Sequence, residues 1–442
     1  MNIVVPPSAT SPSASRSVGH YAAVTNELVN DPTPKDQAIY IPSVSPGYAM
    51  TAYAKDWKRD LPKDVSPEDM NFLDPANKLF RISHVMSSAG QALSQARPCI
   101  ITERDRSSVL MIGDSGGYQI ASGRLKINGD ADKLKILRWL EQHADVAMTL
   151  DVPTGPVLKP GYQYRTSRDC LNATEHYLAF FQKHRKSSDT RFLNVLQGNN
   201  TKETDAWYKA VKKYQFEGWA FAGKMRHNFF NLCRRIIQML DENQLPDNSW
   251  IHILGTNDLE TAIGLTAIQR ALTKHVNRNI RISYDTSTPF RMLSWSLVYT
   301  TPRFERQLMS MPSTKIPDDP RYLGSSLRFP WPSALGNKLT MGDVCHRPAA
   351  TGDTTLDSQS HHYMSLHNLS ALCDGVAFAN RVFDSEGVTH QHSIGTAIGA
   401  AVEAIEEIFK AGKQESVLKY RNTFMHLRHG IEPQSGDEER DF

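Results

Sequence analysis

Three carboxylates in this 442-residue chain stand where short apolar runs end: Asp114, Asp151 and Asp285. Two carboxylates beside one reacting carbon can divide into a proton donor and a nucleophile, because like charges at close range raise one pKa. Holding three acids together is costly unless they are used, so the pattern favours acid/base or nucleophilic chemistry. The alternative is that each acid caps the helix after its strand, since Asp is a good N-cap residue.

Residues that suit a planar, hydrogen-bonding ligand accompany these acids. Asp114 opens the stretch DSGGYQ (114–119), where two glycines let backbone N–H groups approach a ligand closely and Tyr118 offers a stacking surface. Gln197-Gly198 and Gly223 follow two further apolar runs. Carboxylates and amides around an aromatic ring suit a nitrogen heterocycle, and no glycine-rich phosphate loop follows any of these runs.

The elements that must position these residues are repeated strand–helix units. Besides the run that ends at Asp114, apolar runs end at residues 150, 196, 222, 254 and 284, and helical stretches follow over 166–186, 203–214, 229–243 and 259–276. At least six strands alternating with helices predict a parallel sheet. An open doubly wound sheet and a closed (β/α)8 TIM barrel both fit. We favour the barrel, because its strand ends all converge on one site and no GxGxxG or P-loop is present.

Composition divides the chain into four parts. Residues 1–35 and 431–442 predict flexible tails, since the first is rich in Pro and Ser and the second is polar. Residues 36–310 are expected to form the main barrel. Residues 311–430 are expected to complete it and to add a helical subdomain, with irregular insertions and an amphipathic helix over 396–412.

The bulk numbers indicate a cytoplasmic globular protein. The chain is 40% apolar and 22% charged, and its formal charge of +3 is too small to indicate nucleic-acid binding by itself. Five scattered cysteines without a CxxC motif favour a reducing compartment. We find no 18-residue apolar run and no apolar signal core near the N-terminus, so we expect neither a membrane span nor membrane association.

Six segments between residues 114 and 291 resemble, in order, the tRNA-guanine transglycosylase superfamily. DSGGYQ matches the family's DSGG[FY]Q block residue for residue, and YDTSTPFR (284–291) keeps the spacing D-x-x-x-P-x-R of the family's nucleophile segment. The remaining matches are Asp151, LQGN (196–199), AFAGK (220–224) and HILGT (252–256). The chain departs from the family at Val152, Ala222 and Lys224, where a glutamate, a glycine and a hydrophobic residue are usual.

The resemblance implies a (β/α)8-barrel enzyme that cuts the N-glycosidic bond of guanine and inserts a 7-deazaguanine without a catalytic cofactor. Asp285 would attack C1′ and form a covalent glycosyl-enzyme, while Asp114 would act as acid and base. The resemblance also implies two sets of binding residues: Ser115, Gly116, Gly117, Tyr118, Gln119, Asp151, Gln197, Gly198, Gly223 and Lys224 for the purine, and Arg226 and Arg291 for the nucleic acid. Lys224 stands where the family's pocket senses the group on C7, which favours 7-cyano-7-deazaguanine.

One family motif is missing. The bacterial and eukaryotic tRNA enzymes bind a structural zinc with CxCxxC and a later histidine, whereas only Cys345 remains in that region of this chain. The segment SLHNL (365–369) resembles the family's zinc-histidine block. A rearranged zinc site built from Cys345, His362 and His367 is one expectation, and ordinary polar histidines are the alternative.

The missing cysteines decide which nucleic acid we expect as the partner. Catalytic blocks without the zinc cluster, and DTST after the last strand, look most like the DpdA-type DNA-guanine transglycosylases of phages and bacterial genomic islands, where modified DNA escapes restriction. The expected partners are DNA, with the target nucleotide flipped out or single-stranded, and a free 7-deazaguanine base. A divergent tRNA-guanine transglycosylase is the first alternative. A non-catalytic nucleic-acid-binding subunit and an unrelated barrel glycosidase are the others.

Overall fold

The computed structural model describes residues 36–93, 97–186, 189–305, 308–347, 354–384 and 396–427. Both predicted tails, 1–35 and 431–442, lie outside the described residues. None of the described helices is both long enough and apolar enough to cross a membrane.

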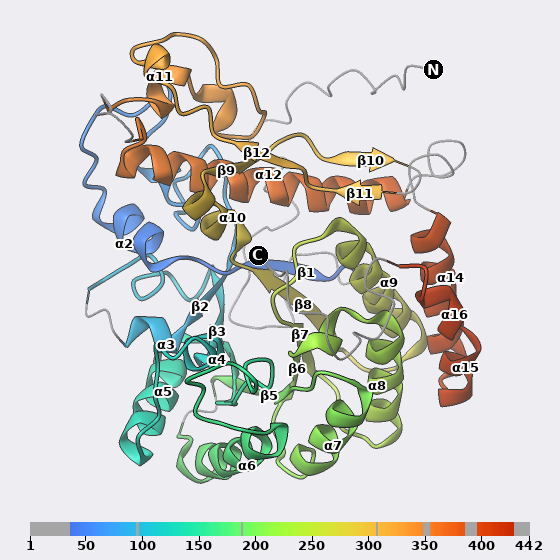
Figure 1. Cartoon of the computed structure of the whole chain (residues 1–442). Helices are drawn as coiled ribbons and strands as arrows, with labels where there is room; N and C mark the ends of the chain where they lie inside the picture. Colours follow the sequence, from blue (N-terminus) through green and yellow to red (C-terminus); the bar gives the residue numbers. More distant parts are fainter. Residues whose placement is uncertain are drawn as a thin grey trace.

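Eight parallel strands form a (β/α)8 TIM barrel at the centre of the molecule (Figure 1). The strands are β1 Ile39–Pro42, β2 His84–Ser88, β3 Leu110–Asp114, β4 Val146–Met148, β5 Arg191–Leu196, β6 Gly218–Phe221, β7 Trp250–Ile253 and β8 Arg281–Thr286. Their order in the sheet is β1-β8-β7-β6-β5-β4-β3-β2. A parallel bridge between Ser43 and Met86, and a 3.0 Å hydrogen bond from the Val44 N–H to the Met86 carbonyl, join β1 to β2. The predicted barrel is therefore confirmed, and the open doubly wound sheet is wrong.

Two of the eight strands were not among those identified in the sequence. β1 reads IYIP and β2 reads HVMSS. The first is only four residues long and ends in proline, and the second carries His and Ser, so neither has the long apolar run that marks a buried strand. Both strands are buried nevertheless, because the closed sheet surrounds them.

The long helices follow the strands and cover the outside of the barrel. They are α5 Asp130–His143, α6 Ser167–His184, α7 Thr201–Val211, α8 Phe229–Asp241 and α9 Leu259–His275. The last four confirm the helices predicted after the strands. Short elements occupy the loops: α2 Pro46–Ala54, η3 Glu68–Met70, α3 Ala89–Ala92, α4 Gly117–Ala121 and η4 Lys224–His227.

Alternation along the strands fills the barrel interior. Residues two apart on a strand point to the same side, so every second side chain faces the barrel axis. The inner cluster consists of Ile39, Ile41, Met86, Leu110, Ile112, Val146, Met148, Leu193, Val195, Ala220 and Trp250. This inner cluster fills the barrel below the carboxyl ends of the strands. Polar side chains at those ends are therefore supported by a closely packed core.

The chain beyond β8 adds helices and short strands but no further barrel strand among the described residues. The segment contains α10 Thr288–Arg291, η5 Met292–Trp295, β9 Leu297–Tyr299, β10 Arg303–Glu305, β11 Leu308–Ser310, β12 Ser313–Lys315, η6 Pro320–Tyr322, η7 Gly336–Lys338, α11 Met341–Val344, α12 Ser358–Asp384, α14 Thr396–Ala411, α15 Gln414–Lys419 and α16 Arg421–Phe424. Helix α12 crosses the top of Figure 1 and packs against α9 and β1. Helix α14 confirms the amphipathic helix predicted over 396–412.

Candidate active site

Asp114 and Asp285 lie at the carboxyl ends of β3 and β8, which β1 and β2 separate in the closed sheet. Asp114 stands two residues after Ile112 of the inner cluster, so strand alternation directs it toward the barrel axis. Asp285 is directed inward in the same way, because Ser283, two residues earlier, bonds to Trp250 of that cluster. The barrel therefore brings both acids to one rim, as the sequence predicted.

The capping alternative for the three strand-end acids is wrong. The N-cap residue of α6, the helix after Asp151, is Thr166, which forms a capping box with Asp169. The caps of the helices that follow Asp114 and Asp285 are Gly116 and Ser287. Because other residues begin these helices, capping gives no reason for acids at the strand ends.

A pair of donors holds one oxygen of the Asp285 carboxylate. The Gly255 N–H donates to Oδ1 at 2.8 Å, and the His252 Nε2 lies 3.3 Å from the same oxygen. Among the described residues no hydrogen bond reaches Oδ2. The side chain is only 7% exposed, so the second oxygen faces a largely enclosed space. The arrangement fixes the carboxylate and leaves one oxygen free to react.

His252 is a site residue that the sequence did not single out. The Trp250 indole N–H can only donate, so Ser283 Oγ accepts from it at 2.7 Å. The Ser283 hydroxyl proton is then available to His252 Nδ1, also at 2.7 Å, which leaves Nε2–H to donate to Asp285. This tautomer satisfies all the groups, whereas the other would point a lone pair at the carboxylate. The signal in the sequence was a histidine inside the apolar strand WIHI.

The surroundings of Asp114 favour its protonated form more than water does. Burial raises the pKa of Asp114, and the negative charge of Asp285 raises it further, while the Ser88 hydroxyl, the Gly116 amide and His252 act in the opposite direction. The Gly116 N–H donates to Asp114 Oδ2 at 3.2 Å. A raised pKa moves a carboxyl group toward the range in which it can act as a general acid.

Asp151 and Gln197 form a buried hydrogen-bonded pair. Gln197 Nε2 donates to Asp151 Oδ2 at 2.7 Å, and the two residues are 5% and 4% exposed. Burial raises the pKa of Asp151 to about 7, Asp114 adds to the shift, and the bond from Gln197 opposes it. The buried Ser115 hydroxyl has no hydrogen-bond partner in the described structure. An unsatisfied buried hydroxyl calls for an explanation, and a polar ligand that supplies the missing bond is one.

The predicted glycines provide close backbone approach. Gly116 has φ +108°, and Gly117 lies where a Cβ would come within 3.4 Å of Asp151 Oδ1. Gly198 and Gly223 pack backbone to backbone: both have positive φ, and a Cβ on Gly223 would lie 2.5 Å from the Gly198 carbonyl oxygen. A side chain at Gly198 or Gly223 would therefore clash with neighbouring atoms of the loops.

Tyr118 and Gln119, neighbours on α4, have different surroundings. Tyr118 is 56% exposed, and the Arg291 guanidinium lies 5.8 Å from the centre of its ring. Gln119 is buried, and its Oε1 accepts a 3.0 Å hydrogen bond from the Ser88 hydroxyl. Tyr118 and Arg291 are therefore exposed at the surface, whereas Gln119 links α4 to the end of β2.

Two cations lie on η4, after β6. Lys224 donates its backbone N–H to the Gly198 carbonyl at 3.1 Å. Arg226 Nη1 donates to the Gly223 carbonyl at 2.6 Å, and its Nη2 lies 3.7 Å from where a Cβ on Gly255 would be. Because Gly255 binds Asp285, Arg226 lies beside the loop that holds the carboxylate, a position suited to a phosphate near the site.

The predicted metal ligands lie in separate surroundings. The ring of His362 donates from Nε2 to the Met70 carbonyl at 3.0 Å. Both ring nitrogens of His367 have partners, since Nε2 lies 2.9 Å from the Tyr299 carbonyl and Nδ1 lies 2.8 Å from Ser333 Oγ. Burial lowers the pKa of each histidine to about 4. Both rings therefore act as neutral hydrogen-bonding groups of the protein interior.

Cys345 does not join these histidines. Its Sγ donates to the Pro317 carbonyl at 2.9 Å, and the residue is fully buried. The part of the chain that the structure describes contains no group of three or more His, Cys, Asp or Glu side chains placed to hold a metal ion. The residues proposed for a rearranged zinc site therefore do not fit one.

No family model matches the chain, and a search of the curated proteins also finds no match.

Proposed function

We propose that this chain is a DNA-guanine transglycosylase, an enzyme that exchanges guanine in DNA for a free 7-deazaguanine base such as 7-cyano-7-deazaguanine. The observation that carries the proposal is the pair of carboxylates at one barrel rim. Asp285 is held by one oxygen and has the other free, and Asp114 has a raised pKa. These are the properties required of a nucleophile and of its acid/base partner.

The reaction is two displacements at C1′ of the target nucleotide. In the first, Asp285 Oδ2 attacks C1′ while the bond to guanine breaks, and Asp114 donates its proton to the departing base. In the second, the incoming base gives a proton to Asp114, its nitrogen attacks C1′, and the bond to Asp285 breaks. Each displacement inverts C1′, so the product keeps the original configuration. The Gly255 N–H and His252 stabilise the carboxylate each time it is released.

Recognition of the base is proposed to fall to Asp151, Gln197 and Ser115. The purine edge of guanine offers N–H donors beside a carbonyl acceptor, which suits a carboxylate, an amide and an unsatisfied hydroxyl. Tyr118 offers its exposed ring as the stacking surface. The target nucleotide must leave its stack to reach this rim.

The proposal of DNA rather than tRNA rests on the missing zinc cluster. The sequence lacks CxCxxC, and Cys345, His362 and His367 make other bonds. If the zinc region helps to shape an RNA-binding face in the related tRNA enzymes, its loss favours a different nucleic acid.

The test is incorporation of a radiolabelled 7-deazaguanine into DNA or tRNA. We expect label in DNA with the wild-type chain, and none with Asp285→Ala, which also loses any covalent DNA–protein adduct seen on a denaturing gel. Asp56→Ala, at an exposed carboxylate, is the matched control. Label in tRNA alone would assign the chain to the tRNA enzymes. Undiminished turnover by Asp285→Ala would remove the nucleophile from the proposal.

A further inference from the structure

We infer that Arg291 and Trp295 extend the stacking surface of Tyr118 into a stacking row: Tyr118 stacks on the flipped base, and Arg291 and Trp295 bind the unpaired DNA bases next to it. The inference rests on the proposed function, since it concerns the same barrel rim. It adds a subsite for the DNA bases that flank the flipped nucleotide. This subsite includes Trp295, a residue that neither the sequence motifs nor the catalytic geometry singled out.

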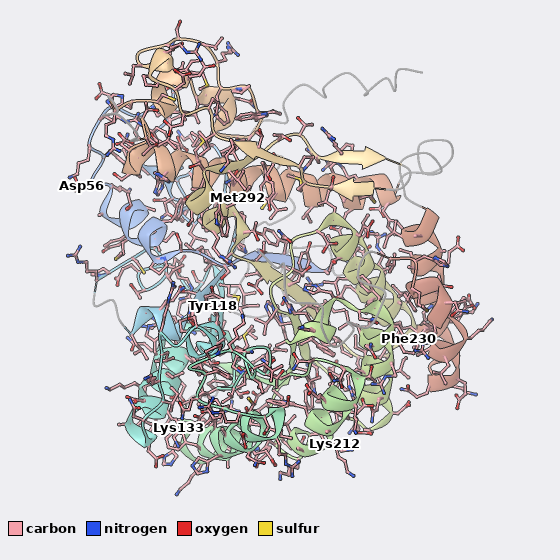
Figure 2. All side chains as sticks on the ribbon, viewed as in Figure 1. Asp56, Tyr118, Lys133, Lys212, Phe230 and Met292 are labelled. Atoms are coloured by element: carbon pink, nitrogen blue, oxygen red, sulfur yellow. The ribbon has the colours of Figure 1, made fainter. Side chains whose placement is uncertain are left out.

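The row is defined by two contacts of one guanidinium. The Arg291 guanidinium lies 5.8 Å from the centre of the Tyr118 ring and 5.9 Å from the centre of the Trp295 ring. Both distances fall within the range of a cation–π contact. Tyr118 lies on α4, after the strand of Asp114, and the other two lie on α10 and η5, after the strand of Asp285 (Figure 2 labels Tyr118 and Met292, the first residue of η5). The row therefore connects the two loops that carry the acids.

Both aromatic rings of the row are exposed to solvent. Tyr118 is 56% exposed and Trp295 is 41% exposed. Among the described residues, only one other Phe, Tyr or Trp side chain has a comparable exposed fraction, namely Tyr53 at 44%. Two of the three most exposed rings thus lie on either side of one arginine, at the rim of the candidate active site. Successive bases of a single strand stack on such rings irrespective of sequence.

The charge of the row suits the backbone of that strand. Arg291 is exposed and has no acidic partner in the part of the chain that the structure describes. Lys315 donates from Nζ to the Trp295 backbone carbonyl at 2.7 Å, so a second cation is bonded to the main chain of the residue that carries the indole. A guanidinium without an acidic partner between two exposed rings matches a strand in which phosphates alternate with bases. A protein partner has no such repeat, so single-stranded or locally opened DNA is the occupant we assign.

The experiment measures binding of a single-stranded DNA oligonucleotide that carries 2-aminopurine next to the target guanine. Trp295→Ala is expected to weaken binding roughly 5- to 150-fold and to remove the quenching of the 2-aminopurine fluorescence. Trp295→Phe should retain most of both. Tyr53→Ala, the equally exposed control on α2, should bind like the wild-type chain. Thermal unfolding of each variant checks that the fold is intact.

Salt dependence separates charge from stacking. Arg291→Ala should reduce the slope of log affinity against log salt by about 0.7, whereas Trp295→Ala should leave it unchanged because no charge is removed. Unaltered binding and quenching in Trp295→Ala would overturn the stacking row even if base exchange proceeds normally. Trp295-dependent binding without any base exchange would support the row and remove the proposed function. Tighter, Trp295-dependent binding of the matching RNA would overturn the assignment to DNA.

Discussion

Replacing Asp151 with asparagine is expected to stabilise the fold while it damages the site. Asp151 is 4% exposed, and burial raises its pKa to about 7. Asparagine has the same shape and keeps an oxygen that can accept the hydrogen bond from Gln197 Nε2, which now spans 2.7 Å to Oδ2. The variant removes a charge that the folded protein holds at a cost, but it also removes the carboxylate proposed to bind the N–H groups of the purine edge.

The size of the effect follows from the pKa shift. The shift runs from 3.8 to about 7, and each unit corresponds to about 1.36 kcal/mol, so the gain in unfolding free energy has an upper bound on the order of 4 kcal/mol. Because the pKa is higher in the folded chain, the carboxyl is protonated in both states below about pH 4 and there the cost vanishes. The cost grows as the pH rises toward 7 and is complete above it.

Denaturant unfolding of wild type and Asp151→Asn at about pH 5 and about pH 8 measures this directly. The variant should be more stable by a margin that is clearly larger at the higher pH. Asp56→Asn, at a carboxylate that is 67% exposed, is the control and should follow the wild type at both values. An equal margin at the two pH values, or a margin larger on the acid side, would refute the electrostatic reasoning.

The other predictions concern the two hydrogen-bond donors that hold Asp285 (His252 and the Gly255 N–H, here called the carboxylate clamp), the packing of Gly223 against Gly198, and zinc. His252→Phe removes a donor from Asp285 and should slow base exchange about 10- to 100-fold, with partial recovery in His252→Gln, which keeps an N–H; equal rates in all three chains would contradict the clamp. Gly223→Ala should lower the unfolding free energy by about 1–3 kcal/mol in denaturant titrations, because φ is +70° and the new methyl meets the Gly198 carbonyl; an unchanged midpoint would argue against this packing. Treatment with a zinc chelator should leave the unfolding temperature unchanged in a thermal-shift assay, and a fall would show that the folded protein depends on a bound metal.

The sequence predicted most of the barrel because its signals are local. An apolar run of four to six residues and the amphipathic helix after it are properties of neighbouring residues, so six strands and the helices between them could be identified. β1 and β2 could not be identified this way. Their burial comes from closure of the sheet at Ser43 and Met86, which are distant in sequence.

The position of the acids was also within reach of the sequence, since a strand end in a parallel barrel always lies at the same rim. Asp114, Asp151 and Asp285 could be chosen as site residues without knowing which residues surround them. Their individual pKa values could not be predicted in this way. Which acid gains a raised pKa depends on burial and on charges from other strands.

Contacts between strands and between loops were decided only by the tertiary structure. His252 looked like one polar residue in an apolar strand, and only the register of β7 against β8 places it between Ser283 and Asp285. Cys345, His362 and His367 were close in sequence, yet folding gives each a different partner. A sequence pattern indicates on which side of a helix or strand a residue lies. A site also requires residues from different elements to come together, and this depends on barrel closure and loop packing.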